Sequence, residues 1–226
     1  MSRLALLRRA LAALCLAAGV LQAVHAATEA PDGTRTWDFQ VLLDGKPIGS
    51  HRFDVTTAGE RTTVKSEAHF AVKLLGLTIY RYDHQDQEAW QGGCLRKMDS
   101  RTDDNGKTFT VNATADADGL RVKTGDGASP VLITVAGCTM GFAYWNPAML
   151  KEKQLLNSQT GEYQAVVVGA PATDEVLARG VRQPARRYHL TGPENPLDLW
   201  YSPEGEWLGL ESTMSGGRRL RYRLLP

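Results

Sequence analysis

Polar and apolar residues alternate along most of the chain after residue 30, in short runs separated by turns rich in glycine and aspartate. In "TWDFQVLL", for example, the alternation places on one face Trp37, Phe39, Val41 and Leu43. Side chains of a strand point alternately to the two faces of a sheet, so this period predicts half-buried β-strands. Many such runs at near-regular spacing predict an all-β fold, a curved antiparallel sheet forming a barrel or half-barrel.

One short helix is expected near residues 147–156. Asn146 suits the position before a helix, and Pro147 suits its first residue. The following "AMLKEKQLLN" is too short to be stable alone, so it must pack on the sheet through Met149, Leu150 and Leu156. The segment is preceded by "GCTMGFAYWNP", residues 137–147, where a cysteine, a methionine and three aromatic residues crowd together.

The first residues have the pattern of a secretory signal peptide. Arginines near the start precede an apolar run, residues 10–21, and small residues lead to a cleavage position after Ala26. The run is shorter than the roughly 20 apolar residues that a membrane span requires. We therefore expect removal of residues 1–26, a single domain over residues 27–226 that does not span the membrane, and a periplasmic location. An uncleaved membrane anchor is the alternative.

Two cysteines, Cys94 and Cys138, lie within the expected mature chain. In an oxidising compartment such a pair most simply forms a disulfide. The alternative is a reactive thiol, but no C-x-x-C motif and no adjacent resolving cysteine support it. The predicted disulfide would connect the start of a strand to the aromatic segment around Phe142.

The charge of the chain argues against two classes of partner. The formal net charge is +1, and the leader contains arginines but no acidic residue, so the mature chain is slightly negative. The signs are mixed and no basic stripe is present. These features argue against nucleic acid, and against an anionic membrane surface, as the main partner.

The run "YRYDHQDQEAW" is the most suggestive strand for chemistry. A regular strand would place on one face Tyr80, Tyr82, His84, Asp86, Glu88 and Trp90. His84, Asp86 and Glu88 could hold a divalent metal or act as an acid–base pair, but same-face neighbours lie about 6.5–7 Å apart and would need a bend to converge. The simpler interpretation is a water-lined face with aromatic rings at its apolar end. No metal or other cofactor is therefore expected.

Other local signatures of catalysis are absent from the sequence. It contains no G-x-S-x-G, S-x-x-K, H-E-x-x-H or Walker A motif. His51, His69 and His84 fall on consecutive expected strands and could approach one another, although isolated histidines on a polar face are the simpler interpretation. His189 is expected at the surface.

The aromatic residues allow two interpretations. They could fill the core, or some could line an apolar cavity within a barrel. If a cavity exists, the candidate ligand-contacting residues are Tyr80, Tyr82, His84, Phe142, Tyr144 and Trp145.

Several blocks of the chain resemble an uncharacterised family of exported bacterial proteins, classed as a domain of unknown function. They include "YRYDHQDQEAW", "GCTMGFAYWNP" and "LWYSPEGEWLGLES". The resemblance extends over the whole expected mature chain. It implies an envelope location and a β-rich fold, and it supplies no catalytic or binding residues.

These observations predict a non-catalytic periplasmic protein that binds or carries an apolar or amphipathic, lipid-like ligand. One alternative is an envelope module that docks a protein partner through a sheet edge or the aromatic segment. The other is an enzyme, such as a hydrolase or a metal-dependent enzyme, that uses His84, Asp86 and Glu88.

Overall fold

The structure, a computed structural model, describes residues 32–125 and 130–226. The predicted signal peptide, residues 1–26, lies outside the described residues. Within the described ranges no helix is long and apolar enough to cross a membrane.

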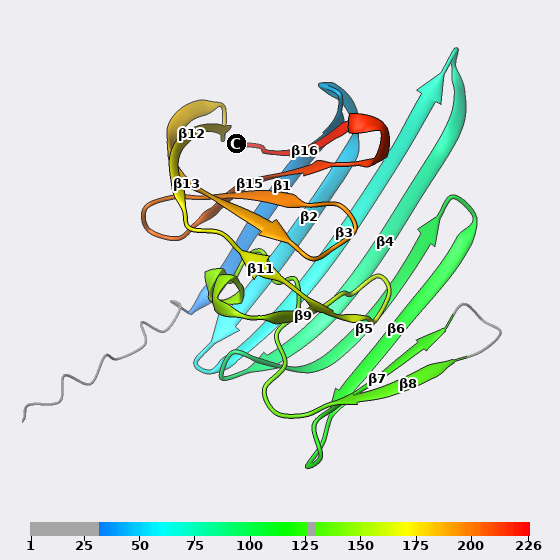
Figure 1. Ribbon diagram of the computed structural model, residues 1–226, viewed down its shortest axis with the longest axis vertical. Coiled ribbons are helices and arrows are strands. Elements are labelled where there is room, and N and C mark those ends of the chain that lie inside the picture. The colour runs from blue at the N-terminus through cyan, green and yellow to red at the C-terminus, as the bar shows by residue number, and fades with distance from the viewer. Residues whose placement is uncertain (1–31, 126–129) are drawn as a thin grey trace, which may run out of the picture.

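The chain folds into a large antiparallel sheet, as the alternation predicts (Figure 1). Its first half is a meander of β1 (Gly33–Leu43), β2 (Lys46–Ala58), β3 (Arg61–Leu74), β4 (Leu77–Gln91), β5 (Cys94–Asp104), β6 (Lys107–Ala115), β7 (Leu120–Gly125) and β8 (Val131–Val135). The second half contains β11 (Val167–Val168), β12 (Ala172–Ala178), β13 (Val181–Thr191), β14 (Leu197–Tyr201), β15 (Trp207–Thr213) and β16 (Arg219–Leu224).

The two halves are joined where the last strand pairs with the first. β16 lies antiparallel to β1, with Phe39 opposite Leu224, so the sheet runs from β8 through β1 and β16 to β13. At that end β13 pairs with both β11 and β12, and the edges of the sheet do not meet. The C-terminal strands fold across the long N-terminal strands (Figure 1). The architecture is therefore a half-barrel.

The core lies between the long strands and the folded-over C-terminal strands. Trp37, Phe39 and Trp207 are fully buried there, and the rings of Phe39 and Trp207 lie 4.3 Å apart between centroids. The Trp37 indole N–H donates to the Trp207 carbonyl oxygen at 3.1 Å. Polar indole atoms are thus satisfied inside an otherwise apolar core, as buried polar groups require.

Residues 137–166, which we name the crossing segment, lie against the inner face of the sheet. The segment contains a short 3-10 helix, η1 (Pro147–Lys151), and a two-stranded ribbon of β9 (Gln154–Leu156) and β10 (Tyr163–Ala165). Its Ser158 carbonyl oxygen accepts from the Ser100 hydroxyl at 2.6 Å, and its Gln159 side chain accepts from the Tyr82 hydroxyl at 3.1 Å. Both bonds attach the segment to the inner side of β4 and β5.

The helix expected near residues 147–156 begins where predicted and ends early. Asn146 caps it by accepting from the Ala148 N–H at 3.0 Å, and Met149 is buried as expected. After Lys151 the backbone becomes extended. Leu156 belongs to strand β9, and its N–H donates to the carbonyl oxygen of Met140. Leu155 and Leu156 are both fully buried in this extended form. In the extended form these adjacent side chains point to opposite sides, and both sides are covered, so packing determines where the helix ends.

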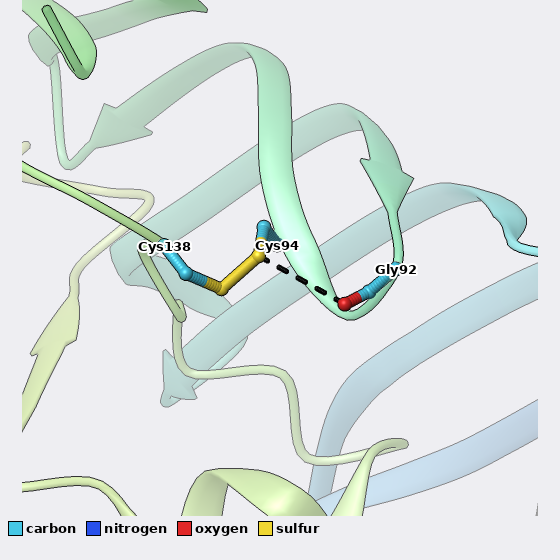
Figure 2. Close-up of a disulfide and its surroundings, with 3 residues drawn as sticks. All are labelled: Gly92, Cys94 and Cys138. Carbon is cyan, nitrogen blue, oxygen red and sulfur yellow. Dashed lines mark hydrogen bonds between the residues drawn. A yellow bond between two sulfur atoms is a disulfide. The ribbon is translucent and has the colours of Figure 1, made fainter.

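A disulfide between Cys94 and Cys138 joins the crossing segment to the start of β5 (Figure 2). The Cα atoms of the two residues lie 5.0 Å apart, and the carbonyl oxygen of Gly92 lies 3.8 Å from Cys94 Sγ. The Leu95 N–H also donates to the Thr139 carbonyl oxygen at 2.9 Å. The predicted pairing is therefore present, and one covalent and one hydrogen bond fix this end of the segment.

Candidate functional site

A cavity of about 800 Å³ opens on the inner side of the half-barrel. One wall is the inner face of β2, β3 and β4, and the opposite wall consists of the crossing segment and the ends of β14–β16. Its apolar lining includes Ile48, Phe53, Phe70, Val72, Leu210 and Leu220. The cavity therefore combines a sheet wall, whose inward residues follow from the alternation, with a wall that the alternation does not predict.

All six residues predicted as candidate ligand contacts line this cavity. Tyr80, Tyr82 and His84 come from β4, and Phe142, Tyr144 and Trp145 come from the crossing segment. Asp86 and Glu88 line it as well, so the inward face of β4 is the one that the sequence predicts. Trp90, the last member of that face, is buried beneath and packs edge-on against Trp145 at 5.6 Å.

Two histidines lie inside the cavity, contrary to the expectation of isolated histidines on a polar face. The rings of His51 and His84 are 6.4 Å apart. His51 hydrogen-bonds Ser66 through Nε2 at 2.7 Å and Tyr222 through Nδ1 at 3.2 Å. Alternation explains this placement, because His51 shares a face with the buried residues of β2.

The other two histidines of the described residues lie outside the cavity. His69 is on the opposite face of β3, where its Nδ1 lies 2.7 Å from Asp83 Oδ1. His189 is exposed and lies 3.0 Å from Asp198. The surface position predicted for His189 is thus confirmed.

The cavity histidines are held in the neutral form. Burial lowers the pKa of His84 to about 4, and its Nδ1 pairs with the Thr102 hydroxyl at 2.8 Å. Burial, reinforced by the neighbouring histidines His84 and His69, also lowers the pKa of His51 well below its ordinary value. Both rings are therefore uncharged at neutral pH and act as hydrogen-bonding groups.

Asp86 and Glu88 form a pair of carboxyl groups at the inner end of the cavity. Burial, followed by the negative charge of Glu88, raises the pKa of Asp86 well above its usual range. Burial raises the pKa of Glu88, whose Oε2 accepts from the Trp90 indole N–H at 2.8 Å. Asp86 is only 5% exposed, and its Oδ1 has no hydrogen-bond partner within the described residues. Burial therefore favours protonation of the pair, and Asp86 contributes a buried oxygen without a hydrogen-bond partner among the described residues.

His84 and the two carboxyl groups have different hydrogen-bond partners. His84 bonds to a threonine hydroxyl, and Asp86 interacts with Glu88. Across residues 32–125 and 130–226, no group of three or more His, Cys, Asp or Glu side chains could hold a metal ion. Six polar residues form what we name the polar belt, a row of mostly neutral groups in an otherwise apolar cavity: His51, Ser66, His84, Asp86, Glu88 and Tyr222.

Sequence reasoning missed two contributors to this belt. Tyr222 reaches His51 from β16, although 171 residues separate them. Ser66 reaches the same ring from β3. Alternation gives their inward direction, since Tyr222 shares a face with Leu220 and Leu224. It does not give the pairing of β16 with β1 that brings Tyr222 to His51.

A family model described as a domain of unknown function (DUF6134) matches residues 39–225. No functionally curated protein is significantly similar to the chain. Among solved structures, the chain is similar to a beta-barrel-like protein of domain of unknown function DUF1849 from Brucella abortus, with a TM-score of 0.60. The two sequences are 12% identical, and the match covers 84% of this chain and 94% of the other. At this identity the similarity describes the fold alone.

Proposed function

The chain belongs to the DUF6134 family, and we propose that it is a non-catalytic carrier of one apolar or amphipathic, lipid-like molecule. The observation that carries this proposal is the cavity of about 800 Å³ beneath the crossing segment. Ligand sites of proteins have volumes of roughly 300–1,000 Å³ and are mostly apolar with a few oriented polar groups. The cavity matches this description in size and composition.

The distribution of polar groups favours an amphipathic ligand over a purely apolar one. Phe70 stacks on Tyr82 with ring centroids 5.1 Å apart, and with Val72 it provides an apolar wall for a hydrocarbon chain. His51, Ser66 and Asp86 lie further along the same sheet face. The free Asp86 oxygen would accept from a hydroxyl or amine of the ligand, because a buried acceptor without a donor is costly.

We place this carrier in the periplasm. The leader pattern of residues 1–26 supports export, and the disulfide between Cys94 and Cys138 suits an oxidising compartment. An enzymatic role of His84, Asp86 and Glu88 is the weaker alternative. The hydroxyl that His84 contacts, that of Thr102, is fully buried, and the three form no metal-binding group within the described residues.

Titration with a dansyl-labelled fatty acid tests the proposal. Neighbouring residues of a strand point to opposite faces, so Val72→Trp fills the cavity whereas Ala71→Trp adds the same ring outside it. Tryptophan is well tolerated in strands. We expect Val72→Trp to raise the Kd for the probe by about tenfold or more, a loss of about 1.4 kcal/mol, and Ala71→Trp to leave it unchanged.

Two results would contradict the carrier function. One is a wild-type protein that does not bind the probe at any probe concentration below the one at which the fatty acid itself aggregates. The other is equal binding by both variants at equal thermal stability, which would place the probe outside the cavity.

A further inference from the structure

The turn between β3 and β4 differs in chemistry from comparable turns of this chain. In several hairpins of the described residues, two residues of positive φ connect the paired strands: Asp44-Gly45, Leu75-Gly76, Gly92-Gly93, Asn105-Gly106 and Arg179-Gly180. Such turns favour Asn, Asp or Gly at the first position, because other side chains are strained there. Leu75 has φ of +50° and is 96% exposed. A leucine here benefits neither the turn nor the core.

The hairpin also projects beyond its neighbours in the sheet (Figure 1). The pairing of β3 with β2 ends at Phe70, opposite Gly49, and the ladder between β4 and β5 ends at Tyr82, opposite Asp104. Residues 71–80 therefore pair only within the hairpin, among the strands that the structure describes. An isolated two-stranded hairpin is only marginally stable in water.

The projecting tip is apolar. Leu74 is 59% exposed, Leu77 72% and Ile79 54%, and with Leu75 they form what we name the leucine tip. Leu74 and Leu77 are directly opposite cross-strand partners, so their side chains share one face beside the turn, and Leu75 lies in the turn itself. Contiguous exposed apolar surface of this kind marks an interaction site.

We propose that the leucine tip inserts into the surface of a lipid bilayer. The tip is convex, so it can bury its side chains in acyl chains without a complementary groove on a partner. Lys73 lies at its base, and Lys46 and Lys107 are the first residues of β2 and β6, directly after the two hairpin turns at the same end of the meander. All three are exposed, and none forms an ion pair within the described residues.

The lysines complement lipid phosphates around an inserted apolar tip. Lysine stems can lie along apolar surface while their ammonium groups remain at the level of the headgroups. Because the net charge of the mature chain is slightly negative, electrostatic attraction by these lysines is secondary. Burial of the leucines provides most of the binding free energy.

Insertion of the tip would bring the cavity to the membrane surface. Val72, Ile79 and Tyr80 belong to the projecting part of the hairpin and also line the cavity. A bilayer contact at the tip therefore places an apolar path between acyl chains and the cavity. The proposal does not depend on the carrier function, since the tip could bind a bilayer with an empty or filled cavity.

Vesicle sedimentation with a turn-repairing variant tests the proposal. Leu75→Asn creates the Asn-Gly turn that Asn105 and Gly106 already form, and Leu77→Thr keeps a good strand former. Val181→Thr is the matched control, because Val181 is 60% exposed and follows the turn glycine Gly180 as Leu77 follows Gly76. The exported, processed protein is used, with removal of the leader checked by intact mass.

The wild-type protein should sediment with vesicles of phosphatidylethanolamine and phosphatidylglycerol. The double variant should partition at least about tenfold less, and Val181→Thr less than about twofold less. The melting temperature of the double variant should match or exceed that of the wild type, so its loss of vesicle binding cannot come from misfolding.

Three results would overturn the proposal. They are no binding of the wild-type protein to vesicles, equal binding by the double variant, and a dimer in vesicle-free sedimentation that the double variant converts to monomer. The last result would assign the tip to a second copy of the chain. In each case fatty-acid binding by the cavity would remain a separate measurement.

Discussion

His84 couples the cavity to pH through its burial. The pKa of its imidazole falls to about 4 because burial disfavours the charged ring, whereas in the unfolded chain it has its ordinary value near 6.5. Between these values the unfolded state binds more protons than the folded state. The stability that this histidine contributes is therefore complete above pH 6.5 and is lost as the pH falls toward 4.

Replacement of His84 by asparagine should reduce this acid sensitivity. The amide retains a group that can bond to the Thr102 hydroxyl but does not titrate. We expect the stability of the variant relative to the wild type to improve by up to about 3 kcal/mol between pH 7 and pH 4. Urea unfolding at both pH values measures the difference. A constant difference would show that folding does not lower the pKa of His84.

At the level of single residues, the sequence predicts the face to which a side chain points better than it predicts which side chains are in contact. Alternation along β4 correctly gives the inward face that carries Tyr80, Tyr82 and His84. It cannot give the contact between His51 and Tyr222, because that contact depends on the register of β16 against β1. The direction of a side chain depends on its own strand, whereas the distance between two side chains depends on every strand that separates them.

At the element scale, the crossing segment is where sequence reasoning was least complete. Asn146 and Pro147 gave the start of η1, but the extended form of Leu155 and Leu156 is determined by packing against the core. Local propensity favours continuation of the helix, and tertiary burial overrides it. The disulfide, in contrast, followed from the compartment and from the presence of only two cysteines in the expected mature chain.

Removal of the disulfide should destabilise the protein without abolishing its sheet. Residues Cys94 and Cys138 are 44 positions apart, and a cross-link of this span is worth about 2–4 kcal/mol. We expect the free energy of unfolding of the double Cys→Ser variant to fall by that amount, so that it unfolds at a lower urea concentration while its far-UV circular dichroism stays β-rich. Addition of reductant should affect only the wild type. Two free thiols in the unreduced, denatured wild-type protein would refute the pairing.

At the scale of the whole molecule, the cavity results from curvature and from the closing pair of terminal strands. β16 joins β1, and this contact carries Tyr222 and Leu220 to the cavity wall opposite β3 and β4. The alternating pattern predicts an antiparallel sheet with an apolar inner face. It does not determine how far the sheet curls or whether its edges meet, because those properties depend on the twist summed over all strands.

We expect the cavity to hold an apolar or amphipathic molecule in the cell. Native mass spectrometry of the protein purified gently from the periplasm tests it most directly. We predict a bound species of several hundred daltons that is lost on denaturation, is recovered in an organic extract, and is absent from Val72→Trp but present in Ala71→Trp. A wild-type protein that shows only the mass of the bare polypeptide under all gentle conditions, with nothing in the extract, would contradict the account.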